Sequence, residues 1–163
     1  MSFKRWIFLW FISAAAFSPA VAAKYTPEQV KAVYIYRIAS FVFWNADEQM
    51  SDIKICAPDD EQVREILTDI TRDKEIRNKP LHIVDSECDV LYITKKESLS
   101  LLSSEPASTV SISDIKSFTE LGGVVELTTL GGRIKPKVNL NNVGQYTLSA
   151  NFLRVADIVG GKK

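Results

Sequence analysis

The stretch Lys24–Asn45 reads KYTPEQVKAVYIYRIASFVFWN, and it decides the fold because it predicts the helix on which the other segments pack. Thr26 can cap free backbone N–H groups, Pro27 suits the first helical position and Gln29 can return the capping bond. The helix should therefore begin at Pro27. Apolar residues at helical spacing predict a buried, core-facing stripe, formed by Val30, Tyr34, Ile38 and Phe41 with Val33 and Val42 beside them.

The other side of this predicted helix carries three aromatic residues, Tyr36, Phe43 and Trp44. A solvated helix face rarely shows so much aromatic surface, and clustered exposed rings tend to mark contact with another molecule. The simpler alternative is burial under a neighbouring element of the same chain, which needs no partner. The three rings are therefore candidate contact residues.

Residues 1–23 are typical of a cleaved secretory signal. Lys4 and Arg5 precede an apolar run over residues 6–17, which is shorter than the roughly 18 residues that a membrane span needs. Small residues follow, and a cut after Ala22 or one residue later suits a signal peptidase. An uncleaved N-terminal anchor is the alternative. Since no cysteine follows the cut, no lipid anchor is expected.

The composition indicates one domain that does not bind nucleic acid. The 163 residues include 20 basic and 20 acidic side chains, and removing Lys4 and Arg5 leaves 18 against 20, a charge of −2. A chain with this balance and no basic block lacks the footprint that phosphate backbones require. No second apolar segment can span a membrane, so no insertion of the mature chain is expected. Residues 24–163 have the length of a single domain with one core.

Strand and helix patterns alternate after the first helix. Short β-branched or apolar runs predict strands at residues 51–57, 81–84, 88–94 and 108–112. Helical patterns follow Asp59-Asp60, occupy residues 98–103 and follow Ser113-Asp114. A last helix is predicted after Asn141 or Asn142, with an apolar face of Leu148, Phe152, Val155 and Val159. Continuous apolar runs are typical of parallel strands that are covered on both faces.

Residues 124–140 predict a hairpin, because Gly131-Gly132 accepts the positive φ of a tight turn. Its second arm should be a sheet edge, since Pro136 cannot donate a ladder hydrogen bond. Three cations share one face of that arm, Arg133, Lys135 and Lys137. They indicate either edge protection or a site for an acidic partner or a phosphate. The order of elements predicts a three-layer α/β sandwich with a mostly parallel sheet and one antiparallel edge hairpin.

The sequence offers little catalytic chemistry. His82 is the one histidine and lies inside a strand pattern, and any Ser-His-Asp or Cys-His arrangement would have to use it. The turn after the first strand, residues 56–60, has no glycine and two acidic residues that would repel phosphate. One histidine, two distant cysteines and scattered carboxylates do not make a metal-ligand cluster. We therefore expect no catalytic residues, no metal site and no cofactor.

Cys56 and Cys88 are the two cysteines of the chain. In a chain sent to an oxidising compartment, paired thiols usually become a disulfide. The predicted strands argue against it, because neighbouring parallel strands would hold the two Cα atoms beyond the limit of about 7 Å. The disulfide is favoured, but its formation stays open at this point. If formed, it closes a loop of about 30 residues and stabilises the fold by about 3 to 4 kcal/mol.

Several segments resemble the YfiR-like family of periplasmic proteins, and together they cover nearly all of residues 24–163. The aromatic helix Val30–Trp44 resembles the opening signature of that family. Further matches follow in the order of the family: Ile55-Cys56, Cys88–Ile93, Val110–Asp114 with Phe118 and Gly122-Gly123, and Val138–Leu140 with Leu148-Ser149 and Leu153–Ala156.

The resemblance implies a periplasmic regulator without catalysis. Family members of this kind repress an inner-membrane diguanylate cyclase by binding its periplasmic sensor part, and an outer-membrane lipoprotein relieves the repression. Related domains also occur as sensory modules of membrane kinases. The family fold is a Rossmann-like α/β sandwich that often forms homodimers. Its cysteine pairing carries over onto Cys56 and Cys88, whereas a second pair found in some members has no counterpart here.

Three functions from different classes follow. The first is a protein-interaction module that represses a cyclase. The aromatic residues of the first helix are its first candidate contacts, and the three cations of the hairpin are its second. The second is a small-ligand sensor that binds a metabolite at the carboxyl ends of the strands. The third is a secreted hydrolase, which would require His82.

Overall fold

The computed structural model describes residues 24–161. The predicted signal segment lies outside the described residues, so its cleavage and the boundary of the mature domain stay predictions. The elements run in the order α1 (Pro27–Ser40), β1 (Val42–Trp44), η1 (Asp47–Gln49), β2 (Ile53–Cys56), α2 (Glu61–Thr71), β3 (Glu75–Ile76), β4 (Lys79–Ile83), β5 (Val90–Ile93), η2 (Lys96–Ser103), β6 (Val110–Ser113), β7 (Val125–Leu130), β8 (Arg133–Asn139), η3 (Leu140–Asn142), β9 (Tyr146–Leu148), α3 (Ala150–Val155) and β10 (Asp157–Val159).

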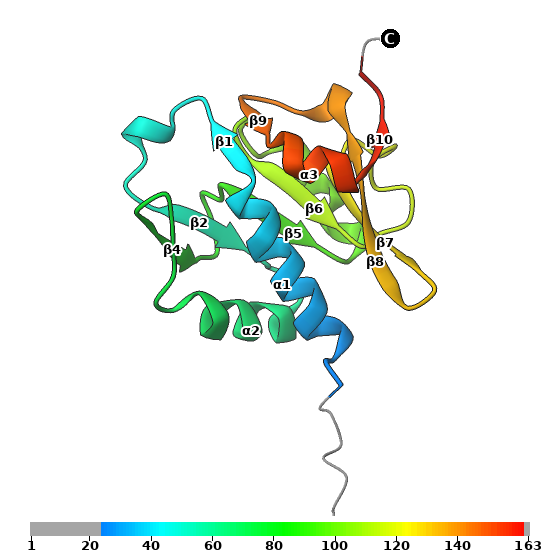
Figure 1. The fold of residues 1–163 in the computed structure, drawn as a ribbon, viewed down its shortest axis with the longest axis horizontal. Helices are drawn as coiled ribbons and strands as arrows, with labels where there is room; N and C mark the ends of the chain where they lie inside the picture. Colours follow the sequence, from blue (N-terminus) through cyan, green and yellow to red (C-terminus); the bar gives the residue numbers. More distant parts are fainter. Residues whose placement is uncertain (1–23, 162–163) are drawn as a thin grey trace, which may run out of the picture.

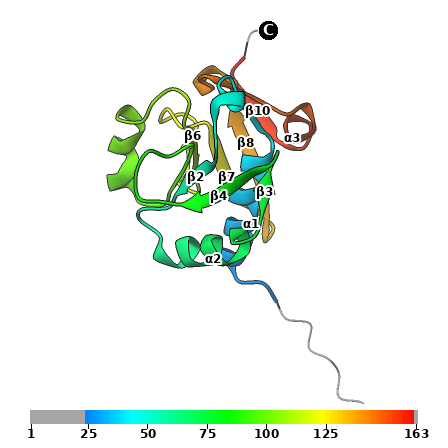
Figure 2. The same cartoon turned by 90° about the vertical axis from the view of Figure 1, so that its left-hand side faces the viewer.

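The predicted three-layer α/β sandwich with a mostly parallel sheet is confirmed. One sheet has eight strands in the order β10-β8-β7-β6-β5-β2-β4-β3, and β1 pairs with β9 in a second, two-stranded sheet. Residues on β5 alternate between two cores: Val90 and Tyr92 pack with α1, whereas Leu91 and Ile93 pack with the leucines of η2. The α-helices cover one face of the sheet (Figure 1). Figure 2 shows η2 on the side away from α1 and α3.

Helix α1 begins where its capping residues predict. Thr26 Oγ1 accepts a hydrogen bond from the Gln29 backbone N–H at 3.1 Å, and Gln29 Oε1 accepts one from the Thr26 N–H at 2.9 Å. The prediction that the helix continues to Trp44 is wrong. It ends at Ser40, because β-branched and aromatic residues favour extended structure and residues 42–44 pair antiparallel with β9.

The predicted core-facing stripe of α1 is wrong in register. The buried residues are Ala32, Ile35, Ile38 and Ala39, and of these only Ile38 belongs to the predicted stripe. All four belong to the main core cluster. Val33 is 44% exposed, and Val30, Tyr34 and Phe41 are half-buried, whereas Val42 is buried as predicted, although in β1 and not in the helix. Most of the predicted stripe therefore lies along the flank of the helix.

The hairpin of β7 and β8 is antiparallel as predicted, and Gly131 and Gly132 have φ values of 55° and 74°. The prediction that β8 is the sheet edge is wrong for half of the strand. β10 pairs with Lys137–Asn139, so β10 is the outermost strand there. The pairing begins directly after Pro136, which has no N–H to donate.

The predicted long C-terminal helix is also wrong. Only Ala150–Val155 is helical, with Ser149 as its N-cap, and the flanking residues form β9 and β10. Ser149 Oγ accepts a hydrogen bond from the Asn151 N–H at 3.2 Å, so a better cap lies inside the predicted helix. Phe152 is buried there and stacks on Phe41 with ring centroids 5.8 Å apart.

The connection from β4 to β5 crosses over β2 in six residues, 84–89. Parallel crossovers usually need a dozen or more residues. This one is short because β4 and β5 are staggered: Ile83 and Val90 both pair with Ile55, from opposite sides. The Val84 N–H donates to Ile55 O at 3.0 Å, and the Asp89 N–H donates to Lys54 O at 2.8 Å.

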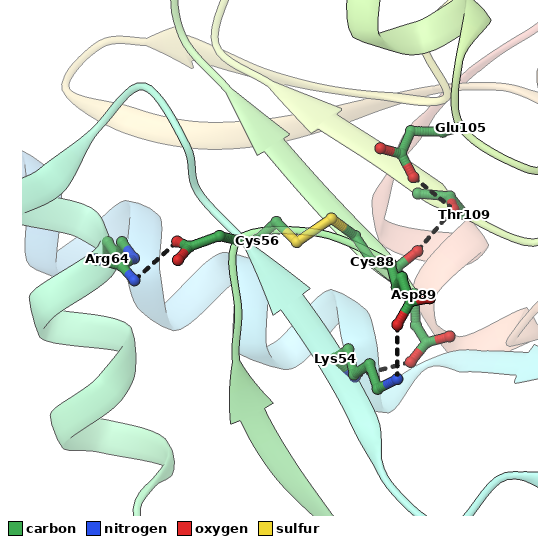
Figure 3. Close-up of a disulfide and its surroundings, with 9 residues drawn as sticks. Lys54, Cys56, Arg64, Cys88, Asp89, Glu105 and Thr109 are labelled. Atoms are coloured by element: carbon green, nitrogen blue, oxygen red, sulfur yellow. Dashed lines mark hydrogen bonds and ion pairs between the residues drawn. A yellow bond between two sulfur atoms is a disulfide. The ribbon is translucent and has the colours of Figure 1, made fainter.

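Cys56 and Cys88 are joined by a disulfide that fastens this crossover to β2 (Figure 3). Their Cα atoms lie 5.7 Å apart. The sequence predicts a larger distance between these Cα atoms because it places Cys88 in a strand beside the strand of Cys56. Cys88 lies in the crossover and not in β5, so the two residues can approach. Thr109, the residue before β6, donates a hydrogen bond from Oγ1 to Cys88 O at 2.7 Å and so holds the same segment (Figure 3).

Candidate functional site

The predicted contact residues of β1 differ in exposure. Trp44 is 4% exposed, and its indole Nε1 donates a hydrogen bond to Ser108 O at 2.9 Å, so it anchors β1 inside the molecule. Its assignment as a surface contact is therefore corrected: a strand turns alternate residues to opposite sides, and Trp44 points inward. Phe43 points outward and is 46% exposed.

Arg77 covers the exposed ring of Phe43. Its guanidinium Cζ lies 4.8 Å from the Phe43 ring centroid, and Nη2 donates to Val42 O at 2.9 Å and to Asp47 Oδ1 at 2.8 Å. Lys79 Nζ lies 3.0 Å from Asp47 Oδ2. The hydrogen bond from Arg77 lowers the pKa of Asp47, against a smaller opposing effect of burial. These contacts tie β1 to the β3–β4 turn, so Phe43 is held in place rather than free.

The carboxyl ends of the parallel strands, where open α/β sheets usually bind ligands, are occupied by protein groups. Asp59 accepts hydrogen bonds from the backbone N–H groups of Thr94 and Lys95 at 2.9 to 3.1 Å. Thr94 Oγ1 donates to Asp114 at 2.7 Å, and Lys31 Nζ lies 2.7 Å from the same carboxylate. These carboxylates stabilise the strand ends and α1, which disfavours a metabolite site built on them.

His82 lies on β4, with its Nε2 3.9 Å from Asp52 Oδ2 and its side chain 55% exposed. Within the described residues it hydrogen bonds to no serine or cysteine. Over residues 24–161, no group of three or more His, Cys, Asp or Glu side chains is placed to hold a metal ion. In the same range, no helix has the length and apolarity that crossing a bilayer requires.

The half-exposed stripe of α1 lines a groove, which we call the flank groove. Three adjoining cavities of about 490, 300 and 180 Å³ make it up. Tyr25 and Val30 line the first two, Tyr34 joins the second to the third, and Ile134 lines the first and third. The groove therefore follows α1 from its N-terminus to α3.

The opposite wall of the flank groove is formed by β8 and α3. The Tyr34 side chain reaches from α1 to this wall, where its hydroxyl donates a hydrogen bond to Ile134 O at 3.0 Å, so it divides the groove into separate cavities. Pro136, Phe152 and Val155 line the third cavity beside Phe41. Val155 is 63% exposed, so the apolar surface continues beyond the groove. Such a continuous exposed apolar surface is typical of an interaction site.

The charges that line the flank groove are all positive: Lys24, Lys31, Arg37 and Lys135, with no Asp or Glu among the lining residues. Lys31 pairs with Asp114 and Lys135 with Asp157. Neither Lys24 nor Arg37 has an ion pair within residues 24–161. The groove is thus largely apolar, and its uncompensated positive charge comes from Lys24 in the first cavity and Arg37 in the third.

The structure does not gather the predicted contact residues into one surface. Tyr36 is two positions from Tyr34, hence on the opposite flank of α1. Phe43 follows the C-terminus of α1. Arg133, Lys135 and Lys137 alternate with residues that pack toward α1, so they lie on the other face of β8, where Lys137 Nζ is 3.6 Å from the buried carboxylate of Glu126. Lys135 reaches the groove only at its border.

Sequence reasoning missed the groove and the Arg77 clamp. The groove had a signal, because α1 is apolar over more than half of its circumference, which one buried face cannot use. The only signal for the Arg77 clamp in the sequence was the turn residue Asn78. Asn78 has a φ of 61° and follows Arg77 in a two-residue hairpin turn.

The fold and the site define an α/β sandwich with an open, largely apolar flank groove along its first helix. The chain belongs to the YfiR/HmsC-like family, whose model matches residues 28–157. This confirms the resemblance drawn from the sequence. The family is a regulatory, non-catalytic family of periplasmic proteins that act on diguanylate cyclases. A comparison with curated proteins gives no match.

Proposed function

We propose that this protein binds the periplasmic sensor part of an inner-membrane diguanylate cyclase and represses it, which lowers cyclic di-GMP signalling. The observation that carries this proposal is the flank groove: a helix stripe that the chain could have buried stays half-exposed beside Lys24 and Arg37, which have no ion pair within residues 24–161. Family membership supports the choice of partner. Relief by an outer-membrane lipoprotein and formation of a homodimer belong to the same proposal.

Repression of this kind is a population shift. The domain must bind the inactive state of the cyclase more tightly than the active state, because a ligand with equal affinity for both shifts nothing. Moving the cyclase almost completely between its states takes a difference of about 5.5 kcal/mol. Burial of the exposed valine and tyrosine surface along α1, and pairing of Arg37 with an acidic group, would contribute to this difference where only the inactive state of the cyclase makes these contacts.

Deletion of the gene tests the proposal, with cellular cyclic di-GMP as the measurement. We expect the level to rise and the wild-type gene to restore it. Val33→Glu should fail to restore it, since Val33 is exposed in the groove and tolerates a charge without loss of the fold. Lys116→Glu is the matched control, because Lys116 is exposed in the loop over the opposite face of the sheet. An unchanged level in the deletion strain would contradict the proposal.

A further inference from the structure

We infer that the flank groove receives an amphipathic α-helix of the partner whose polar face is acidic. The inference rests on the proposed function, since it describes how the repressed partner is held. It follows from the length of the groove, from its charge, and from the state of the β8 edge.

The groove has the dimensions of a helix site. It runs along α1, whose 14 residues span about 21 Å at 1.5 Å per residue. Its three cavities adjoin pairwise through shared lining residues, and the Tyr34 side chain, bonded to Ile134 O, separates the first from the third. An elongated occupant that passes over Tyr34 can contact all three. A helix places apolar anchors at i, i+4 and i+7, which matches a set of separate depressions on both sides of Tyr34. A compact metabolite would fill one cavity and leave the others open.

The charge of the groove selects an acidic occupant. Every charged side chain that lines it is cationic, and Lys24 and Arg37 stand near its two ends without ion pairs among the described residues. Carboxylates on the rim of a docked helix would meet these two side chains, whereas lysines there would be repelled. Complementary charge of this kind gives specificity and speeds association.

The neighbouring strand edge argues against an extended peptide. Addition of a strand to β8 requires free N–H and C=O groups along its unpaired half, residues 133–136. Pro136 has no N–H, and Ile134 O already accepts the hydroxyl of Tyr34 at 3.0 Å. The edge therefore cannot form a regular ladder with an incoming strand, which favours side-chain docking of a helix.

Binding of designed peptides tests the inference. Protein purified from the periplasm of the cell is titrated into labelled helical peptides of about 18 residues, long enough to follow the groove. One peptide has an apolar stripe and a glutamate-rich polar face, a second has lysines in place of the glutamates, and a third is a scrambled acidic sequence. Fluorescence anisotropy gives the affinity. We expect the acidic amphipathic peptide to bind at least about tenfold more tightly than the other two.

Variants of the protein locate the binding. Val33→Glu and Arg37→Glu should each weaken the acidic peptide by about tenfold or more, and Lys116→Glu should leave it unchanged. Added salt should weaken binding to the wild type, because exposed ion pairs are screened. Equal binding of the acidic and basic peptides, or losses that ignore the groove variants, would overturn the inference.

Two other occupants would also overturn it. If Val33→Glu changes the oligomeric state in sedimentation and no peptide binds, the groove is an interface between two copies of this chain. If phosphatidylglycerol vesicles bind the wild type and displace the acidic peptide, the groove takes a lipid surface. The cyclic di-GMP measurement is separate: a rise on deletion without peptide binding defeats the helix inference alone, and an unchanged level with peptide binding defeats the choice of cyclase.

Discussion

Single residues connect segments of this molecule that are far apart in the chain. The guanidinium of Arg77 bonds to Val42 O and to the carboxylate of Asp47, which lie 35 and 30 residues away. Trp44 reaches Ser108 O across 64 residues. Such contacts fix the exposed ring of Phe43 on β1, so the position of a candidate contact residue depends on side chains from other elements.

The Asp47 pair predicts a pH-dependent stability. Because the Arg77 hydrogen bond lowers the pKa of Asp47 in the folded state, the ionised carboxylate stabilises the fold above its unfolded pKa of about 4. This contribution is lost as the pH falls through the lowered pKa. Asp47→Asn should reduce the unfolding free energy by about 1 kcal/mol at pH 7, and the difference should shrink toward pH 3 or below.

Urea denaturation at both pH values measures this effect. Asp69→Asn is the control, because Asp69 pairs with Arg72 on the surface of α2 and both side chains are well exposed. The control should change stability little at either pH. An equal loss for Asp47→Asn at pH 7 and pH 3 would show that the charge of Asp47 does not contribute.

Residues whose roles are local could be predicted from the sequence, and residues whose roles depend on distant partners could not. Thr26 caps α1 as predicted, and Asp60, one of the two aspartates before the second predicted helix, caps α2, since a capping oxygen and the N–H that donates to it lie within three residues. The sequence places Trp44 on a surface because the residues next to it in the chain do not reveal that β1 pairs with the distant strand β9. The long-range pairing moved this ring from a helix surface into the core.

At the scale of elements, substitutions on two faces of α1 test which face is buried. Ile35 is fully buried against the sheet, whereas Val33 is 44% exposed in the flank groove. Ile35→Ala should therefore cost about 3 kcal/mol of unfolding free energy, through lost burial and the cavity left behind. Val33→Ala should cost less than about 1 kcal/mol, because little buried surface is lost.

Chemical denaturation of the two variants under one condition compares these losses directly. The comparison is matched, since both changes shorten a β-branched side chain on the same helix. A larger loss of unfolding free energy for Val33→Ala than for Ile35→Ala would mean that the face predicted by the apolar periodicity is the buried one.

The periodicity of α1 could not identify the buried face, because apolar residues occupy both possibilities. The stripe of Val30, Tyr34 and Phe41 is more strongly apolar than the face of Ala32, Ile35 and Ala39. Packing in the core, which includes residues of α2 and of the sheet, selects the face of the two alanines, and that requirement is tertiary. The same limit applies to β9 and β10, which are three residues each and are defined by pairing with β1 and β8.

At the scale of the whole molecule, the disulfide joins β2 covalently to the crossover between β4 and β5, and this bond contributes to the stability of the fold. It closes a loop over a sequence separation of 32 residues. Replacing both cysteines by alanine should lower the unfolding free energy by about 3 to 4 kcal/mol, since the unfolded chain regains the entropy of that loop. Urea denaturation of the double variant and of the wild type measures the difference.

A reductant gives the internal control. It should lower the stability of the wild type toward that of the double variant and leave the double variant unchanged. A double variant within about 1 kcal/mol of the wild type would mean that the packing around Cys88 and Thr109 already holds the crossover without the covalent bond.

The architecture as a whole could be predicted because it depends on patterns that repeat. Apolar strand runs, capped helices and the glycine turn at Gly131-Gly132 together required an α/β sandwich with an antiparallel hairpin. The staggered crossover could not be predicted, because it depends on the level at which β4 and β5 pair with Ile55. For this reason the cysteine separation was overestimated while the pairing itself was expected.

The stapled crossover also makes the stability of this fold depend on the redox state of its surroundings. Cytoplasmic thiols are kept reduced, so the link between Cys56 and Cys88 needs an oxidising compartment. Without the link, the folded state loses the entropic advantage of the closed loop. The periplasm, where proteins of this family act, is a compartment in which such a bond persists.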